Sequence, residues 1–201
     1  IGTPQASTPG EPQDPTTEPS SDPSFSPTRM VVARNASKSE RRQIRRLQLR
    51  AIRAAGPGAA IHVATESMQG QVVYKALTAA YDRGVDVTVL LGRKRLTGQD
   101  KALRKLLGTR VTDASWFRRA PKAWTTSRVV RARALEAQKP TTLLISRAGN
   151  TRAFSLVSNT KMDKAPLRTS SRHRSTARVT VDLPTYDKLY EQYLAQVGRA
   201  Y

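Results

Sequence analysis

Hydrophobic residues recur at helical spacing in four segments of the chain. In the first segment, Ile44, Leu47 and Ala51 lie on one stripe, and the sequence Gly56-Pro57-Gly58 ends the pattern. In the last segment, Pro184 stands at the first helical position, where proline is favoured because its missing amide hydrogen is not needed there. The pattern predicts helices over residues 39–55, 72–83, 99–107 and 184–198.

Short runs of aliphatic and β-branched residues lie between these helices. The runs 60–65 and 85–91 are separated by a single helix, which is typical of parallel strands joined by a right-handed crossover. Two later runs flank the turn sequence 147–151 and predict a hairpin. The predicted strands are 60–65, 85–91, 142–146, 153–158 and 177–182. Together with the helices they predict an α/β fold, a mixed sheet flanked by helices.

The first 28 residues have a composition of their own. They contain seven prolines and one large aromatic residue, Phe25, and cannot bury enough apolar surface to offset their chain entropy. We expect residues 1–28 to be a disordered leader that makes few contacts, followed by a basic domain over residues 29–201. Such leaders are common after a removed export signal, and this chain starts at Ile1 rather than Met. The leader predicts a processed or truncated chain that is secreted or associated with the cell surface.

The charge of the chain is strongly positive and unevenly distributed. Lysine and arginine total 35 against 15 aspartates and glutamates, which gives a net charge of +20. Four of the acidic residues and no basic residue lie in the leader, so the remaining chain carries 35 positive and 11 negative charges, a net of +24. This density indicates attraction to nucleic acid, anionic lipid or another polyanion, with strong salt dependence. The alternative is a charge that serves only solubility.

Two groups of residues are candidates for contact with a polyanion. Trp116 and Trp124 stand among basic residues in segment 112–140, which also carries a helical pattern around 128–138. These tryptophans either stack on bases or lie at a lipid interface, or they are buried anchors of a long loop. The first predicted helix carries six arginines, which form either a binding face or a solvated one: Arg41, Arg42, Arg45, Arg46, Arg50 and Arg53.

The composition excludes several kinds of site. The chain has no cysteine, so it has neither a disulfide framework nor a thiolate metal site. With only His62 and His173 present, the sequence also argues against a histidine metal cage, and we expect no metal and no cofactor. No apolar run approaches the roughly 18 residues that span a bilayer, so we do not expect a transmembrane protein.

Three stretches resemble the phospholipase D-like superfamily, and in particular its exported actinobacterial members. Residues 39–92, with IHVATES and ALTAAYDRGVDVTVLL, resemble the strand, helix and second strand that open one half-domain of that fold. Residues 143–158 (LLISRAGNTRAFSLVS) resemble the strand pair that carries the active-site motif, and TARVTVDLPTYDKLYEQYLAQVG resembles the final strand and helix. The resemblance covers nearly all of residues 39–199 and implies a phospholipase D-like half-domain.

The resemblance implies phosphodiester chemistry by two His-x-Lys pairs around a pseudo-twofold or dimer axis. One histidine attacks phosphorus, the other protonates the leaving group, and lysine and asparagine bind phosphate oxygens without a metal. In this chain the matching positions hold Lys139 and Thr141, and the acidic position that follows holds Ser146. A lysine with an ordinary pKa of about 10.4 is protonated at pH 7 and cannot replace the nucleophilic imidazole. The catalytic motif is therefore degenerate.

The remaining site candidates are weaker. His62 lies in the first predicted strand, where a core histidine is favoured over a catalyst, and His173 stands in a basic loop as a solvated polar residue. Ser158, Asn159 and Thr160 match polar residues that support phosphate in the superfamily, or they only end a strand. The predicted phosphate or polyanion contacts are Arg41, Arg42, Arg45, Arg46, Lys139, Asn159, Lys161, Arg172 and Arg174.

Three functions are compatible with these observations. The favoured one is a non-catalytic phospholipase D-like domain that binds a phosphate-rich polyanion, either nucleic acid or an anionic phospholipid surface. The first alternative is an active phosphodiesterase or phospholipase whose histidine is unconventional or supplied by a partner. The second is a structural half-domain that assembles as a homodimer or with a second phospholipase D-like half. Activity on a chromogenic phosphodiester, together with the particle mass in solution, distinguishes the three.

Overall fold

The computed structural model describes residues 24–27, 31–32, 38–68, 70–92, 95–120, 141–158, 162 and 177–198. The helices are α1 (Lys38–Ala54), α2 (Gln71–Asp82), α3 (Gly98–Leu107) and α4 (Leu183–Gly198). The strands are β1 (Val31–Val32), β2 (Ala60–Thr65), β3 (Asp86–Leu91), β4 (Trp116–Arg119), β5 (Thr141–Ala148), β6 (Thr151–Ser158) and β7 (Ala177–Thr180). In the described part of the chain they form one seven-stranded sheet in the order β1-β7-β6-β5-β2-β3-β4.

The sheet is mixed, as the sequence predicts. Strands β2, β3 and β4 are parallel, whereas β5 runs antiparallel to β2 and β6, and β7 runs antiparallel to β6 and β1. Parallel neighbours need a crossover, which α2 and α3 supply, while β5 and β6 are joined by a two-residue turn. The predicted α/β fold class is confirmed. Among the described helices, none is long and apolar enough to cross a membrane.

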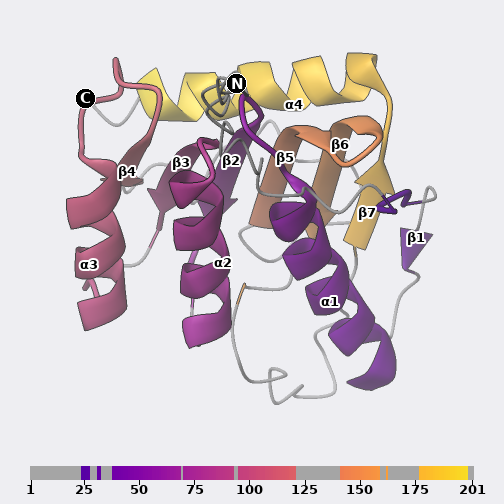
Figure 1. The fold of residues 1–201 in the computed structure, drawn as a ribbon, viewed down its shortest axis with the longest axis horizontal. Coiled ribbons are helices and arrows are strands. Elements are labelled where there is room, and N and C mark those ends of the chain that lie inside the picture. Colours follow the sequence, from indigo (N-terminus) through magenta and orange to yellow (C-terminus); the bar gives the residue numbers. More distant parts are fainter. Residues whose placement is uncertain are drawn as a thin grey trace, which may run out of the picture.

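Helices cover both faces of the sheet. Figure 1 shows α1, α2 and α3 side by side, with α4 set apart from them and lying crosswise. The core under α1–α3 includes Ile52, Leu77 and Ile145, and a second core under α4 includes Leu144 and Tyr193. Consecutive residues of β5 thus contribute to opposite cores, as strand geometry requires.

Hydrogen bonds fix the end of α1 against the end of α2 and against the hairpin of β5 and β6. The guanidinium of Arg83 donates to carbonyl oxygens at the end of α1, those of Ile52, Arg53 and Ala55. The amide of Gly149, in the hairpin turn, donates to the carbonyl oxygen of Ala54 at 2.8 Å. These bonds satisfy carbonyl groups that have no partner within the helix. The C-terminal end of α1 and the β5–β6 turn therefore lie at the same end of the domain.

The predicted helices and strands are all present, and their ends differ from the predicted ones by no more than two residues. Two strands are additional. Strand β4 pairs with β3 through residues such as Trp116 and Phe117, but Arg118 and Arg119 conceal its pattern in the sequence. Strand β1 is a two-residue edge pair with β7. The helical pattern around 128–138, Trp124 and nearly all of the basic loop 159–175 lie outside the described residues.

The expectation that the leader makes few contacts is wrong at Phe25. Its side chain is 1% exposed and belongs to the core under α1–α3. The ring packs edge to face on Phe154 with centroids 5.7 Å apart, and the guanidinium of Arg50 lies 5.8 Å above it. The hydroxyl of Thr151 also donates to the Phe25 carbonyl oxygen at 3.1 Å. A single aromatic residue therefore anchors an otherwise Pro- and Ser-rich segment.

Candidate functional site

Three hydroxyl side chains meet at one end of the sheet. Thr65 ends β2, Thr141 begins β5 and Ser158 ends β6. Because β5 is antiparallel to both neighbours, these positions come together, and the register pairs Thr141 directly with Ser158. All three side chains are completely buried. With the buried Ser67 that follows β2, they form what we call the hydroxyl cluster.

Two hydrogen bonds link members of the hydroxyl cluster. Thr65 Oγ1 donates to the carbonyl oxygen of Ser67 at 3.2 Å and lies 2.9 Å from Thr141 Oγ1. Since a hydroxyl group has one proton, Thr141 is the donor of the second bond. The position that the resemblance matches to a phosphate-holding lysine thus carries an uncharged hydroxyl whose proton is already donated. The cluster contains no ionisable group.

Four exposed arginines form a stripe along α1. Arg42, Arg46, Arg50 and Arg53 are four, four and three residues apart, so they lie on one face of the helix, and we call them the arginine stripe. The C-terminal end of α1 is bound to the β5–β6 turn, so its N-terminal end lies toward the hydroxyl cluster. The helix has 17 residues and is about 25 Å long, close to the length of β5.

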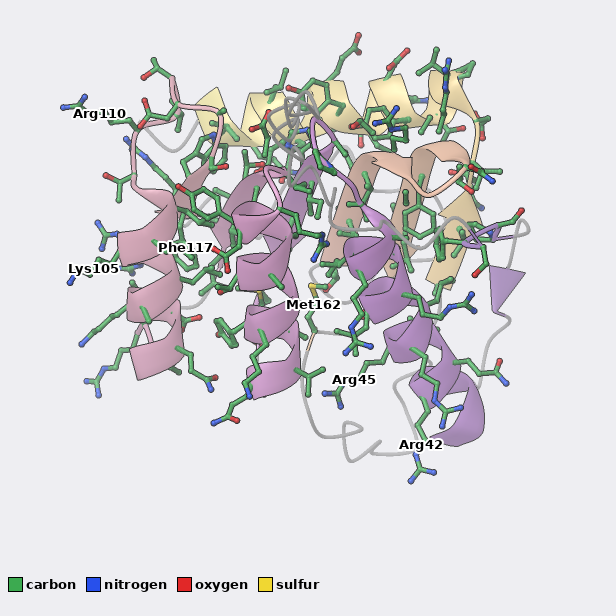
Figure 2. The ribbon with its side chains drawn as sticks, in the orientation of Figure 1. Arg42, Arg45, Lys105, Arg110, Phe117 and Met162 are labelled. Carbon is green, nitrogen blue, oxygen red and sulfur yellow. The ribbon has the colours of Figure 1, made fainter. Side chains whose placement is uncertain are left out.

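The predicted arginine contacts divide into three groups. Arg42 and Arg46 are exposed, Arg45 is half-buried, and Arg41 lies in the first turns of α1. Figure 2 shows Arg42 and Arg45 extending from the end of α1 that is farthest from α4. The other predicted contacts, together with His173, lie outside the described residues: Lys139, Asn159, Lys161, Arg172 and Arg174.

His62 lies on the opposite face of the sheet from the hydroxyl cluster, in the core under α4. Its ring contacts Tyr190 and Tyr193, with centroids 4.7 and 5.4 Å away. Its Nδ1 lies 2.7 Å from Thr88 Oγ1, which in turn lies 2.8 Å from the Tyr193 hydroxyl. Burial lowers the pKa of His62 from 6.5 to about 4, so the imidazole is neutral at pH 7. The sheet separates this imidazole from Thr65 and Thr141.

The aromatic residues around His62 also explain Trp116. This tryptophan is 4% exposed and stacks on Tyr193 with centroids 6.0 Å apart. Burial raises the pKa of Tyr193, which keeps its hydroxyl protonated and able to donate. Trp116 is therefore a buried anchor, which was one of its two sequence interpretations. Within the described residues, no group of three or more histidine, cysteine or acidic side chains is placed to hold a metal ion.

The sequence pattern did not single out several residues that the structure brings together. Thr65 ends a predicted strand and Ser67 follows it, but only the register of β2 with β5 places Thr65 beside Thr141. Arg147 and Arg152 flank the predicted hairpin turn, and their pairing across β5 and β6 is likewise a matter of register. If the hairpin turn is placed at residues 149–150, the register that follows pairs Arg147 with Arg152.

This arrangement of strands and helices defines a phospholipase D-like fold. Nuc from Salmonella typhimurium, described as a phospholipase D family member, is similar with a TM-score of 0.50 and 17% identity, over 87% of this chain and 97% of that chain. NucT from Helicobacter pylori is similar with a TM-score of 0.55 and 11% identity, over 85% of this chain and 96% of that chain. No protein-family model and no curated protein matches the sequence. The resemblance drawn from the sequence is confirmed at the level of the fold.

Proposed function

We propose that this phospholipase D-like domain binds a phosphate-rich polyanion and does not hydrolyse it. The observation that carries the proposal is the arginine stripe, four exposed arginines in line on one face of α1. Guanidinium groups suit phosphate because their planar donors match its oxygens. The net charge of +24 over residues 29–201 adds a long-range attraction.

The loss of hydrolysis is supported by the position that matches the family lysine. Thr141 is completely buried and donates its proton to Thr65, so it offers a phosphate neither a charge nor a free donor. His62 faces α4, on the other side of the sheet from Thr141, so it is badly placed to serve as the nucleophile at this end of the sheet. An active enzyme with a histidine from a partner is the alternative, and it requires a group that this chain would not supply.

Replacing Arg42 and Arg46 together with glutamine should weaken polyanion binding by about tenfold. Each phosphate contact contributes about 0.9 to the slope of log affinity against log salt, so the slope should fall by about 2. The measurement is a salt titration of binding to single-stranded DNA, RNA and anionic vesicles. Both arginines are exposed, so their replacement should leave the fold intact.

The matched control removes the same charge elsewhere. Lys105 and Arg110 are exposed, and Figure 2 shows them on the α3 side of the domain, away from α1. The Lys105→Gln, Arg110→Gln variant should keep the wild-type slope within the error of the titration. If both double variants lose the same affinity, the charge acts diffusely and the arginine stripe is not the interface. Binding that does not respond to salt would remove the polyanion proposal altogether.

The purified domain should show no turnover of a chromogenic phosphodiester, and Lys139→His should create none. The restored histidine would still lack the neighbouring ammonium, because Thr141 carries no charge and its hydroxyl is already donated. The measurement is release of the chromophore at neutral pH with enzyme in excess over background hydrolysis. Turnover by the wild type that disappears in His62→Ala or His173→Ala would overturn the non-catalytic assignment.

Two expectations from the sequence stay predictions. Association with a second copy or a companion half would use exposed apolar groups, and Leu183 and Leu194 are 61% and 46% exposed on one line of α4. Secretion or attachment to the cell surface is the second. A polyanion-binding domain would meet phosphate polymers in either location.

A further inference from the structure

A polar pocket lies at the end of the domain opposite the hydroxyl cluster. It has a volume of about 370 Å³ and is lined by Gly56, Arg147, Gly149, Asn150 and Arg152. Arg147 and Arg152 are direct register partners on β5 and β6, so their side chains leave the same face of the hairpin. Both are exposed. Two arginines therefore leave the same face of the hairpin and line one pocket.

This pair of like charges is not neutralised by the residues that line the pocket, none of which is acidic. Like charges directly opposite each other on neighbouring strands destabilise a hairpin. One contact of the pair is at the limit of a hydrogen bond, 3.5 Å from an Arg147 guanidinium nitrogen to the Pro57 carbonyl oxygen. The residues that line the pocket offer these two guanidinium groups no carboxylate acceptor. An oxyanion in the pocket would relieve the repulsion and accept from both groups.

The backbone holds this pair in place. Gly149 has a φ of 56°, which a type II′ hairpin turn requires at its first position, and its amide is bound to Ala54. On the strand before the turn, Ser146 Oγ accepts from the Ala60 amide at 2.8 Å. Helix α1 and strand β2 thus both anchor the hairpin. An anchored backbone fixes where the two side chains start, which limits the positions that their guanidinium groups can take.

The pocket continues the arginine stripe. The stripe ends at Arg53, in the last turn of α1, and Gly56 three residues later already lines the pocket. A row of cationic groups therefore runs from Arg42 to Arg53, about 17 Å along α1, and on to the pocket at the β5–β6 turn. At about 3.4 Å per nucleotide, the rise along one strand of a duplex, the stripe alone corresponds to about five steps of a nucleic-acid strand.

We propose that Arg147 and Arg152 bind one phosphate group of a nucleic-acid strand that runs along the arginine stripe. This inference rests on the proposed polyanion function and adds the pocket, after the arginine stripe, as a second contact for the polyanion. A strand is favoured over a membrane because a surface that enters lipid pairs its cations with exposed apolar side chains. The large exposed apolar residues of the described chain do not line this pocket: Val72, Leu106, Val181, Leu183 and Leu194.

The test compares two lengths of oligodeoxythymidylate, two and twelve nucleotides, in binding to the whole protein. The twelve-nucleotide strand reaches from Arg42 to the pocket and the two-nucleotide strand does not. The Arg147→Gln, Arg152→Gln variant should bind the longer strand about tenfold more weakly than the wild type and the shorter strand almost equally. The charge-matched Lys105→Gln, Arg110→Gln variant should bind the longer strand more tightly than the shorter strand by the same factor as the wild type.

Thermal unfolding of the same variant provides an independent measurement. Removing two opposed like charges should leave its melting temperature equal to or above that of the wild type, so weaker binding cannot be ascribed to misfolding. If the variant binds the longer strand like the wild type while the Arg42 and Arg46 variant does not, the pocket is not a contact and the proposed function stands. If the wild type binds neither strand but binds anionic vesicles, the nucleic-acid proposal fails and the proposed function stands; if it binds neither strand, no RNA and no vesicles, both proposals fail. A loss confined to anionic vesicles would overturn the assignment to a nucleic-acid strand.

Discussion

Replacing Phe25 with alanine should lower the free energy of unfolding by about 3–5 kcal/mol, the usual cost of removing a fully buried phenylalanine. The ring is 1% exposed and sits between α1 and β6, in contact with Phe154 and under Arg50. Its removal takes apolar area from the core and leaves a cavity that the two anchored elements cannot close. Urea denaturation followed by tryptophan fluorescence measures the effect.

Two companion variants define what the Phe25 result means. Phe25→Leu keeps most of the apolar volume and should cost about 1.5 kcal/mol or less. Leu106→Ala removes an apolar group that is 39% exposed, and it should change stability by no more than about 0.5 kcal/mol. If Phe25→Ala is as stable as Leu106→Ala, the segment before α1 does not pack on the domain and the sequence-based expectation for the leader is restored.

The sequence predicted this fold well because most of its elements are buried on one or two faces. Helix α2 buries Val73, Leu77 and Ala80, which recur at helical spacing. Strand β3 is a short run of β-branched and aliphatic residues, which is typical of a buried strand. Strand β4 escaped prediction because two arginines follow its two buried residues, so the alternation is only half present. The burial of Phe25 was not predicted because composition describes the average of a segment and not the contacts of one residue.

The candidate site was only partly predictable for a different reason. Thr141 was found through the resemblance, but its partner Thr65 stands 76 residues away and meets it only through strand register. The same holds for Arg147 and Arg152, since the sequence predicts the hairpin but their direct opposition depends on which two residues form the turn. His62 could be assigned to a strand from its neighbours, while its place under Tyr190 and Tyr193 depends on where α4 crosses the sheet.

The stability of the protein should fall by about 3 kcal/mol between pH 7 and pH 4 because of His62 alone. In the folded state burial lowers its pKa to about 4, whereas the unfolded value is 6.5. Between these values the unfolded chain binds the proton more readily, so stability falls as the pH drops through 6.5 and the loss is complete near 4. Above pH 7 the imidazole is neutral in both states and the effect is absent.

The variant His62→Asn isolates this contribution. The asparagine amide occupies the place of Nδ1 and keeps a partner for Thr88, but it cannot be protonated in this range. It loses the ring contacts with Tyr190 and Tyr193, so it should be less stable than the wild type at pH 7. The difference between the two proteins, measured by urea denaturation at each pH, should shift by about 3 kcal/mol in favour of the variant by pH 4. His173→Asn, at the other histidine of the chain, should follow the wild-type curve. A constant difference between wild type and His62→Asn from pH 7 to pH 4 would mean that His62 is not buried as described.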